Sequence, residues 1–339
     1  MKILVTGATG FLGSHLVREL CAEAAGAGEI RAMAQSAPAW LRALGVEIVE
    51  GSVTSPADCA RAVQGVGRIY HLAGMVSRVP ADGHKMYAVH VEGTRILGEA
   101  ACAAGVGRMV LCSTSGTIAV SRRPDEMPDE TSPTPTDICT RWPYYASKMY
   151  QEEAARRVCA DAVELVIVNP SLLLGPGDDR LSSTRDVLSF LARDIALTPP
   201  GGLNFVDVRD VAAVLPVAME RGVPGARYLV GGYNWTFSEF FGRLERLTKV
   251  AAPRLASRGK LPLWAARAQA AVYRHWGRKP PIEPASVEMA EYFWYFESTK
   301  AARELRFQPR AAAETLFDTV AYLRTHFMGE SKATSALVR

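Results

Sequence analysis

The sequence lacks the features that mark several large classes of protein. Its 339 residues contain no apolar run near the roughly 18 residues that cross a membrane. The apolar start Met-Lys-Ile-Leu-Val is shorter than a secretory signal. The formal net charge is only +4, from 39 basic and 35 acidic residues, and no basic run typical of nucleic-acid binding occurs. We therefore predict a cytoplasmic globular protein with neither a membrane span nor a nucleic-acid partner.

Cysteine and histidine are sparse and dispersed. No pair among the six cysteines has Cys-x-x-Cys spacing, and the six histidines form no cluster. This pattern is typical of reduced thiols in a cytoplasmic protein, and it predicts no metal site.

Short apolar runs alternate with helical spacing through the first half of the chain. Strands are predicted at residues 2–6, 30–34, 46–50, 69–72, 108–112 and 164–168. Helices are predicted at residues 11–25, 89–104 and 144–160. This alternation predicts an α/β fold with a parallel sheet covered by helices on both faces, the doubly wound sheet of the Rossmann type.

The second half of the chain is less regular. A loop-like stretch follows Asn169, and residues 205–220 predict a short strand and then a helix. From residue 233 onward, helical spacing and aromatic residues prevail.

This division predicts two parts and a tail. The dinucleotide-binding domain comprises residues 1–170 and 205–232. The smaller, mostly helical substrate-binding part comprises residues 171–204 and 233–330. Residues 331–339 are predicted to form a flexible tail.

The sequence VTGATGFLGSHL places three glycines directly after a predicted strand and before a predicted helix. Gly7 supplies a tight turn, Gly10 lets the backbone approach a pyrophosphate, and Gly13 lets the helix pack closely on the sheet. The helix start then offers free N–H groups and the positive end of its dipole to the phosphates. This context predicts a dinucleotide site rather than a plain tight turn.

The Gly-x-x-Gly-x-x-Gly spacing resembles that of the short-chain dehydrogenase/reductase superfamily. The stretches YHLAG (70–74), 90–115, NPSLLLGPGD (169–178) and FVDVRDVA (205–212) resemble blocks of its extended, epimerase-like branch. The similarity covers nearly the whole chain and is nearest to dihydroflavonol-reductase-like and hopanoid-associated reductase/epimerase proteins. It implies cofactor contacts from Gly7, Thr9, Gly10, Phe11, Leu12, Gly13, Gln35, Ser36, Ser52, Val53, Leu72, Ala73, Gly74, Tyr144, Lys148 and Pro170.

The sequence PYYASK places two tyrosines and a lysine on a predicted helix. Tyr144 and Lys148 are four residues apart and share a helix face, and a neighbouring ammonium lowers the pKa of a phenol from about 10. Tyr145 is three residues before the lysine, so spacing alone does not exclude it. The resemblance selects Tyr144 as the catalytic tyrosine, through the signature Tyr-x-x-x-Lys, and implies that Lys148 contacts the nicotinamide ribose. Tyr145 is then expected to pack or to touch substrate.

The sequence LCSTSGT offers three hydroxyl groups at the end of the preceding strand: Ser113, Thr114 and Ser115. A hydroxyl there could bind a substrate oxygen and stabilise developing charge, although serines at strand ends are often only turn formers. The resemblance places Ser115 in the catalytic position and leaves the other two as alternatives.

The chain departs from the family pattern where the cofactor is chosen. Ala34 replaces the acidic residue that binds a ribose 2′-hydroxyl, and Gln35 stands where an arginine would accept a 2′-phosphate. Arg31 and Arg42 could reach this position, but Arg31 is expected to leave the strand on the wrong face. We expect NAD(P)H as cofactor, with a slight preference for NADP(H).

Two further departures concern Ser52 and His90. Ser52 stands where the family commonly has an aspartate that contacts adenine, and His90 replaces a usual asparagine. For His90 we expect a hydrogen bond to the backbone at a helix start rather than a catalytic role.

The reaction is predicted from what the site lacks. The stretch STSG has none of the acids with which the dehydratases of this branch eliminate water, so dehydration is not expected. An epimerase of sugar nucleotides needs arginines for a diphosphate, and Arg180, Arg185 and Arg193 are available but lie near carboxylates. A dinucleotide sensor without turnover is a third hypothesis, disfavoured because the tyrosine and the lysine are both present.

The aromatic stretches LPLWAARAQAAVYRHW and EYFWYF could line an apolar pocket, although such stripes more often belong to a core. We predict an NAD(P)H-dependent oxidoreductase that reduces a ketone of a hydrophobic or aromatic small molecule, with Tyr144 as proton donor. The resemblance also implies a homodimer whose four-helix interface comprises residues 90–104 and 144–160.

Overall fold

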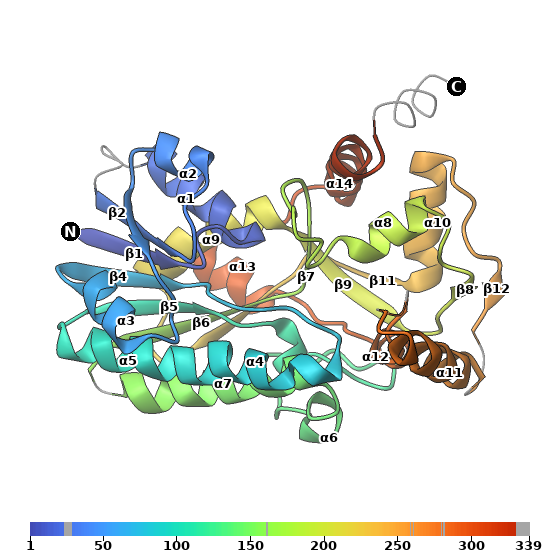
Figure 1. Ribbon diagram of the computed structural model, residues 1–339, viewed down its shortest axis with the longest axis horizontal. Helices are drawn as coiled ribbons and strands as arrows, with labels where there is room; N and C mark the ends of the chain where they lie inside the picture. Colours follow the sequence, from blue (N-terminus) through green and yellow to red (C-terminus); the bar gives the residue numbers. More distant parts are fainter. Residues whose placement is uncertain are drawn as a thin grey trace.

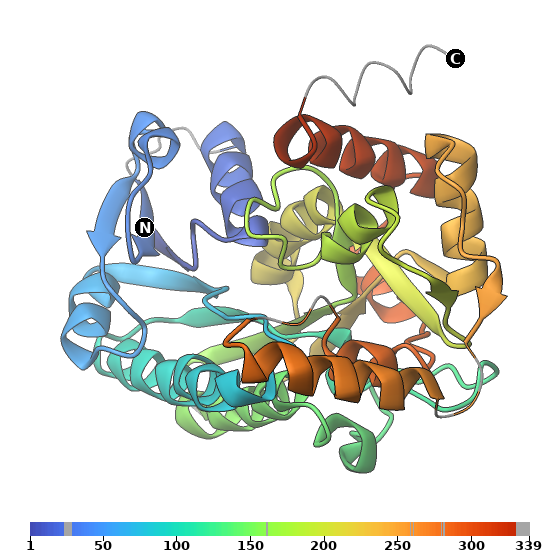
Figure 2. The same ribbon diagram turned by 45° about the vertical axis from the view of Figure 1, so that its right-hand side comes forward.

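The computed structural model describes residues 1–23, 29–160, 162–257, 259, 261–278, 280 and 282–329. The tail predicted at residues 331–339 lies outside these residues. Figures 1 and 2 show a larger part built on a wide sheet and a smaller part that carries most of the carboxyl-terminal helices.

The larger part contains a seven-stranded sheet in the order β10-β6-β5-β4-β1-β2-β3 (Figure 1). Every neighbouring pair in it is parallel. The strands are β1 (Lys2–Thr6), β2 (Ile30–Ala34), β3 (Glu47–Glu50), β4 (Val66–His71), β5 (Arg108–Cys112), β6 (Glu164–Pro170) and β10 (Arg227–Val230). The chain order reverses between β1 and β4, and ligands of such sheets bind at the carboxyl ends of the strands beside this point. The predicted Rossmann-type sheet is confirmed, and β1, β2 and β5 have the predicted bounds.

Helices cover both faces of this sheet. One face carries α1 (Phe11–Glu23), α2 (Ala39–Ala43), α9 (Val208–Arg221) and α13 (Thr299–Leu305). The other carries α3 (Pro56–Val63), α5 (Gly93–Ala103) and α7 (Pro143–Cys159). Successive side chains of a strand point to opposite faces, so Leu4 and Val5 lie in different hydrophobic cores. Burial on both sides explains why the strands are almost continuously apolar.

Short elements connect the strands and helices near the carboxyl edge of the sheet. They are η2 (Pro80–Asp82), α4 (Gly83–Tyr87), the π-helical turn η3 (Ala88–Glu92), the turn η4 (Ser115–Thr117) and α6 (Thr136–Cys139). The helix predicted at residues 89–104 is therefore η3 continued by α5. Sequence reasoning missed α3, although Ser55 caps it by accepting from Asp58 N–H and Pro56 opens its first turn, both ordinary start signals.

The smaller part has its own three-stranded sheet of β7 (Leu172–Leu174), β9 (Gly202–Asp207) and β11 (Tyr233–Thr236). Around it lie α8 (Arg185–Leu191), α10 (Phe237–Thr248) and α14 (Ala312–Phe327), whose apolar side chains share one core. A pair of two-residue strands, β8 (Leu197–Thr198) and β12 (Leu255–Ala256), precedes α11 (Leu261–His275) and α12 (Pro284–Met289).

The chain passes between the two parts more often than the predicted boundaries suggest. Residues 205–207 belong to β9, which pairs with β7 and β11 of the smaller sheet. Helix α13 was predicted to belong to the smaller part. Its Ala301 and Leu305 instead join the core of the larger part beneath α9. The two parts therefore share elements along the cleft between them.

Candidate active site

The glycine loop between β1 and α1 is shaped by contacts that leave no room for side chains. Gly7 has a φ of +67°, and a Cβ there would lie 2.7 Å from the Leu72 carbonyl oxygen. A Cβ on Gly13 would lie 2.1 Å from the Gly7 carbonyl oxygen, and Gly10 N–H donates to that same oxygen at 2.9 Å. The turn therefore brings the start of α1 to the carboxyl edge of the sheet, where its first N–H groups have no partner within the helix. These residues fit the pyrophosphate of a dinucleotide.

The other expected cofactor contacts surround this loop. Thr9 and Phe11 are half-buried, and Leu12 is buried. Leu72, Ala73 and Gly74 follow β4, and Ala73 N–H donates to the Thr6 hydroxyl at 3.2 Å. Pro170 ends β6 and is buried.

The end of β2 offers little to distinguish the two cofactors. Gln35 and Ser36 are exposed there. Arg31 is 6% exposed and donates to the carbonyl oxygens of Ala62 and Gln64, each at 2.7 Å, so it leaves the strand on the α3 side as predicted. Arg42 pairs with Glu50 at the surface, 2.7 Å away.

The turn after β3, which contains Ser52, is fixed by Asp58 of α3. Ser52 N–H donates to the Asp58 carboxylate at 3.1 Å, and the Ser52 hydroxyl lies 2.8 Å from that of Thr54. Val53 belongs to the core beneath α3 and α5. Ser52 thus stands in a turn that is already hydrogen-bonded.

Tyr144 lies at the first turn of α7, where its ring meets two others edge to face. The centroid of the Tyr144 ring is 5.1 Å from that of Tyr145 and 6.0 Å from that of His90. Burial, with smaller contributions from Tyr145 and Cys112, raises the pKa of Tyr144 well above its ordinary value. The neighbouring lysine was predicted to lower this pKa, whereas burial raises it.

The reason is the position of the Lys148 amine. Its Nζ donates to the Cys112 carbonyl oxygen at 2.9 Å and to Gln151 Oε1 at 2.6 Å. Lys148 is 5% exposed, and burial lowers its pKa. The ammonium is therefore held beneath the end of β5 by partners other than the phenol.

Gln151 connects this lysine to the glycine loop through an unbroken series of buried hydrogen bonds. Its Nε2 donates to the Thr94 hydroxyl at 2.9 Å, and that hydroxyl lies 2.8 Å from His71 Nε2. On the other side of the ring, His71 Nδ1 lies 2.8 Å from the Thr6 hydroxyl. His71 and Gln151 are both wholly buried, and burial lowers the pKa of His71 to about 3. Sequence reasoning missed Gln151 and Thr94, because no local spacing reports a network that spans three strands and two helices.

His90 has a structural role, in agreement with the expectation. Met75 N–H donates to its Nε2 at 3.0 Å, so the neutral ring carries its proton on Nδ1 and donates it to Ser147 Oγ at 2.8 Å. Ser147 in turn donates to the Tyr144 carbonyl oxygen at 2.7 Å. Burial, and then the charge of Lys148, lowers the pKa of His90 to about 2. His90 thus fastens the loop after β4 to the turn that presents Tyr144.

The three candidate hydroxyls after β5 have separate positions. Ser113 donates to the buried Glu152 carboxylate at 2.5 Å, which occupies it away from the cleft. Thr114 caps η4, because its side chain accepts from Gly116 N–H. Ser115 begins η4, adjacent to Thr114 in the chain, and is 5% exposed.

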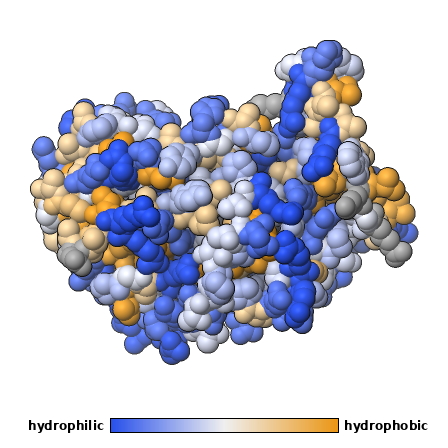
Figure 3. All heavy atoms as spheres, turned by 90° about the horizontal axis from the view of Figure 1, so that it is seen from below, coloured by the Kyte–Doolittle hydropathy of each residue, from blue (hydrophilic) through white to orange (hydrophobic). Residues whose placement is uncertain are grey.

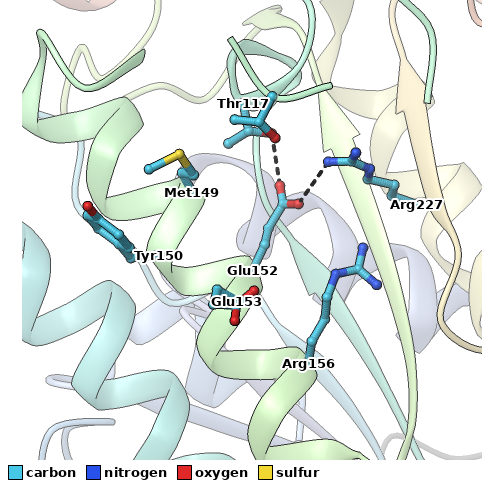
Figure 4. Close-up of a pocket in the computed structure, with 8 residues that line it drawn as sticks. Thr117, Met149, Tyr150, Glu152, Glu153, Arg156 and Arg227 are labelled. Atoms are coloured by element: carbon cyan, nitrogen blue, oxygen red, sulfur yellow. Dashed lines mark hydrogen bonds and ion pairs between the residues drawn. The ribbon is translucent and has the colours of Figure 1, made fainter. Parts of the chain in front are cut away.

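Glu152 forms the floor of a hollow of about 380 Å³ on another side of α7 (Figure 4). Its carboxylate accepts from Thr117 at 2.9 Å and from Asn169 at 2.7 Å, and it lies 3.6 Å from the Arg227 guanidinium. These contacts join η4, β6 and β10 to α7. Neither Tyr144 nor Lys148 lines this hollow, so it is separate from the candidate active site.

Aromatic rings form one wall beside Tyr144. Tyr145 stacks on Trp294 with centroids 4.8 Å apart, and Trp142 lies 6.0 Å from Tyr145. A Cβ on Gly116 would lie 2.2 Å from the Tyr145 ring, so this glycine allows the ring to lie flat against η4. Tyr145 therefore packs at the site, as expected, and the EYFWYF stretch supplies Trp294 to the wall.

An ion pair crosses from the larger to the smaller part in the same region. Arg78, in the loop after β4, donates both guanidinium nitrogens to Asp186 of α8, at 2.9 and 2.7 Å. Arg78 also donates to Ser286 of α12 at 3.2 Å. Burial opposes ionisation of Asp186, but the charge and hydrogen bonds of Arg78 outweigh it and lower the pKa of that carboxyl.

Other sequence candidates lie elsewhere. Arg180, Arg185 and Arg193 are exposed. The expectation that LPLWAARAQAAVYRHW lines a pocket or belongs to a core is wrong for its tryptophans, because Trp264 is 61% and Trp276 is 65% exposed.

Comparisons with known proteins agree along nearly the whole chain. The model of the NAD dependent epimerase/dehydratase family matches residues 3–231. Sterol demethylase protein B of Methylococcus capsulatus (strain Bath) is 33% identical over 334 residues, which cover 97% of this chain and 100% of that protein. A Synechocystis sp. protein with a provisional dihydroflavonol 4-reductase name is 31% identical, over 95% of this chain and 94% of its own. The crystal structure of gox2253 is similar with a TM-score of 0.81 at 30% identity, over 97% of this chain and 99% of that one.

Proposed function

The chain belongs to the NAD dependent epimerase/dehydratase family, and we propose that it is an NAD(P)H-dependent reductase of a ketone on an apolar or aromatic small molecule. The observation that carries this proposal is the position of Tyr144, half-buried in the first turn of α7 and one helical turn before Lys148, whose Nζ donates to the Cys112 carbonyl oxygen at the end of β5. A phenol kept neutral by burial is suited to donating a proton to a carbonyl oxygen.

The residues divide the chemistry as follows. The glycine loop and the start of α1 hold the pyrophosphate, and Lys148 binds the nicotinamide side of the cofactor. A bound nicotinamide dinucleotide supplies the hydride that the carbonyl carbon accepts. Tyr144 donates the proton to the carbonyl oxygen, and Ser115 donates a hydrogen bond to the same oxygen while charge develops on it.

The pairing of Arg78 favours a neutral substrate. This cation, in the loop after β4, is committed to Asp186 by two hydrogen bonds. A sugar nucleotide would require cations free to bind a diphosphate. Tyr145 and Trp294 instead place partly buried aromatic rings of one hydrophobic cluster next to Tyr144. The name of the sterol demethylase relative is compatible with an apolar substrate.

The cofactor preference follows from the end of β2. No carboxylate stands at Ala34 or Gln35 to repel a 2′-phosphate, so we propose a slight preference for NADP(H).

We further propose a homodimer built on α5 and α7, in which the exposed side chains of Tyr150 and Arg95 lie at the interface. Light scattering that gives the mass of a single chain would contradict the dimer.

The function is tested by following the absorbance of NADH and of NADPH with a panel of ketones that range from apolar to sugar-linked. Steady oxidation with apolar and aromatic ketones is the expected result. Interconversion of sugar-nucleotide isomers without net oxidation would replace the proposal with an epimerase, and tight binding without either reaction would indicate a sensor.

A further inference from the structure

Exposed apolar side chains concentrate around α11. Fourteen large apolar side chains are exposed in the described part of the chain, and six of them lie between residues 255 and 282. These six form what we name the α11 face: Leu255 (69% exposed), Leu261 (79%), Trp264 (61%), Val272 (47%), Trp276 (65%) and Ile282 (40%). Isolated exposed apolar residues are normal, but a group of this kind marks an interaction site.

The helix itself is apolar on its outer side. Its buried side chains are the small residues Ala266 and Ala270, one turn apart on the inner side. On the outer side, Leu261, Trp264 and Val272 follow helical spacing and face solvent. An ordinary surface helix has polar residues there. The outer side is therefore built to contact something apolar.

The charge around this face is mostly positive, and its nearest carboxylate, Glu283, is paired with Arg274 at 2.7 Å. Between Glu245 and Glu283 the sequence has no Asp or Glu. It has nine basic residues over the same interval: Arg246, Lys249, Arg254, Arg258, Lys260, Arg267, Arg274, Arg278 and Lys279. The Arg267 guanidinium lies 5.8 Å from the centroid of the Trp264 ring, so cation and apolar surface are adjacent. Such a surface complements one that is apolar within and negatively charged at its rim.

A bilayer with anionic headgroups has that combination. Tryptophan and leucine enter the boundary between headgroups and acyl chains, while arginine and lysine remain among the phosphates. No helix in the described ranges is long and apolar enough to span a bilayer, and α11, with 15 residues, would instead lie in the plane of the surface.

The α11 face is accessible and is connected to the cleft. Figure 2 shows α11 on the outside of the molecule, and in Figure 3 the corresponding part stands out at the upper right, with hydrophilic and hydrophobic side chains intermixed. Helix α11 packs on α12, and Ser286 of α12 accepts a hydrogen bond from Arg78 beside the aromatic wall. Contact through the α11 face would place this side of the cleft next to the bilayer.

We infer that the α11 face docks the protein reversibly on an anionic lipid bilayer. Tryptophan and leucine insert at the boundary of headgroups and acyl chains, and the exposed Arg254, Arg267 and Arg278 bind lipid phosphates. The inference does not depend on the proposed reaction, because it rests on the surface of α11 and not on the catalytic residues.

The test is sedimentation of the full-length protein with vesicles of phosphatidylcholine alone and of phosphatidylcholine mixed with phosphatidylglycerol. Binding to the mixed vesicles that weakens with added salt is expected. The double variant Trp264→Asp and Trp276→Asp should lower the partition coefficient by about tenfold or more, because it puts carboxylates where apolar rings enter an anionic surface.

The matched control is Val223→Asp, which makes the same kind of change at a side chain that is 54% exposed and outside the α11 face. It should bind vesicles like the unaltered protein, and thermal unfolding should show that all variants are folded. Absence of binding to mixed vesicles, or equal binding by the double variant, overturns the inference. A lipid-free dimer that the double variant abolishes also overturns it, because the face would then join two copies of the chain.

Discussion

Helices α7 and α11 both depart from the usual amphipathic pattern, but in opposite directions. Helix α7 buries Ser147, Lys148, Gln151 and Glu152, and each of these polar side chains has hydrogen-bond partners. Helix α11 buries two alanines and exposes Leu261, Trp264 and Val272. Buried polar groups are tolerated only when they are hydrogen-bonded, so the α7 network fixes geometry. Moving exposed apolar groups out of water is favourable in free energy, so α11 is suited to binding an apolar surface.

The comparison separates residues that we propose to act in the reaction from residues that we propose to bind the protein to a bilayer. Changes on α7 and its partners should alter rates or pH dependence, whereas changes on α11 should alter vesicle binding alone. The predictions below concern the α7 side, from the largest expected effect to the smallest.

Replacing Tyr144 with Phe should lower kcat about a thousandfold, because it removes the proton donor. Calorimetric titration should show unchanged affinity for the cofactor, since the glycine loop is intact. A rate near that of the unaltered enzyme would assign proton donation to Tyr145 or to another group.

Ser115→Ala should lower kcat about a hundredfold, the usual effect of removing one donor to a developing oxyanion. Thr114→Val should have a smaller effect on kcat, because its hydroxyl is assigned to the cap of η4 and not to the substrate oxygen. Steady-state kinetics with the same apolar ketone compares the two variants. The opposite order of effects on kcat would transfer the substrate contact to Thr114.

Gln151→Leu should lower kcat about tenfold, because the Lys148 amine loses an acceptor and becomes less well positioned. The pH profile of kcat should shift as well, which a change in folding alone would not produce. Gln151→Glu is the matched control, since it preserves an acceptor for the amine. Equal profiles for the leucine variant and the unaltered enzyme would show that the network is only structural.

His90→Asn should make stability less sensitive to acid. The pKa of His90 is about 2 in the folded protein against 6.5 for an ordinary histidine, so only the unfolded chain takes up this proton between those values. The stability that His90 contributes is present above pH 6.5 and is lost as the pH falls, at about 1.4 kcal/mol per pH unit. Urea unfolding at several pH values below 6.5 should give a slope smaller by about that amount in the variant. An unchanged slope would mean that His90 is not held neutral.

Gln35→Arg should shift the ratio of kcat/KM toward NADPH by about fivefold, because an exposed guanidinium at the end of β2 can bind a 2′-phosphate. Gln64→Arg adds the same charge at another exposed position and should leave the ratio unchanged. No shift in Gln35→Arg would mean that cofactor choice is made at another position.

The sequence predicted the parts of the molecule that depend on local chemistry. The bounds of β1, β2 and β5, the turn at Gly7, and the helix that carries Tyr144 and Lys148 follow from strand and helix periodicity and from the steric needs of glycine. The backbone role of His90 was also anticipated. Apart from the contact of His90 with Met75, each of these features depends on residues that are close together in the chain.

The features that escaped prediction depend on contacts between distant residues. The partners of Lys148 include Gln151, which is local, but Thr94 and His71 come from other elements. The pKa of Tyr144 is raised by burial, which spacing on one helix does not reveal. The tryptophans of α11 have a periodicity that fits a buried stripe, and only the fold shows which side of the helix is covered.

The central claim is net hydride transfer to a ketone with proton donation by Tyr144. The most direct measurement uses reduced cofactor that carries deuterium at its transferable position, an apolar ketone, and mass spectrometry of the product. The account predicts one deuterium on the carbinol carbon of each product molecule and one oxidised cofactor formed with it, both lost in Tyr144→Phe. Product without deuterium, or deuterium transfer that persists in that variant, would contradict it.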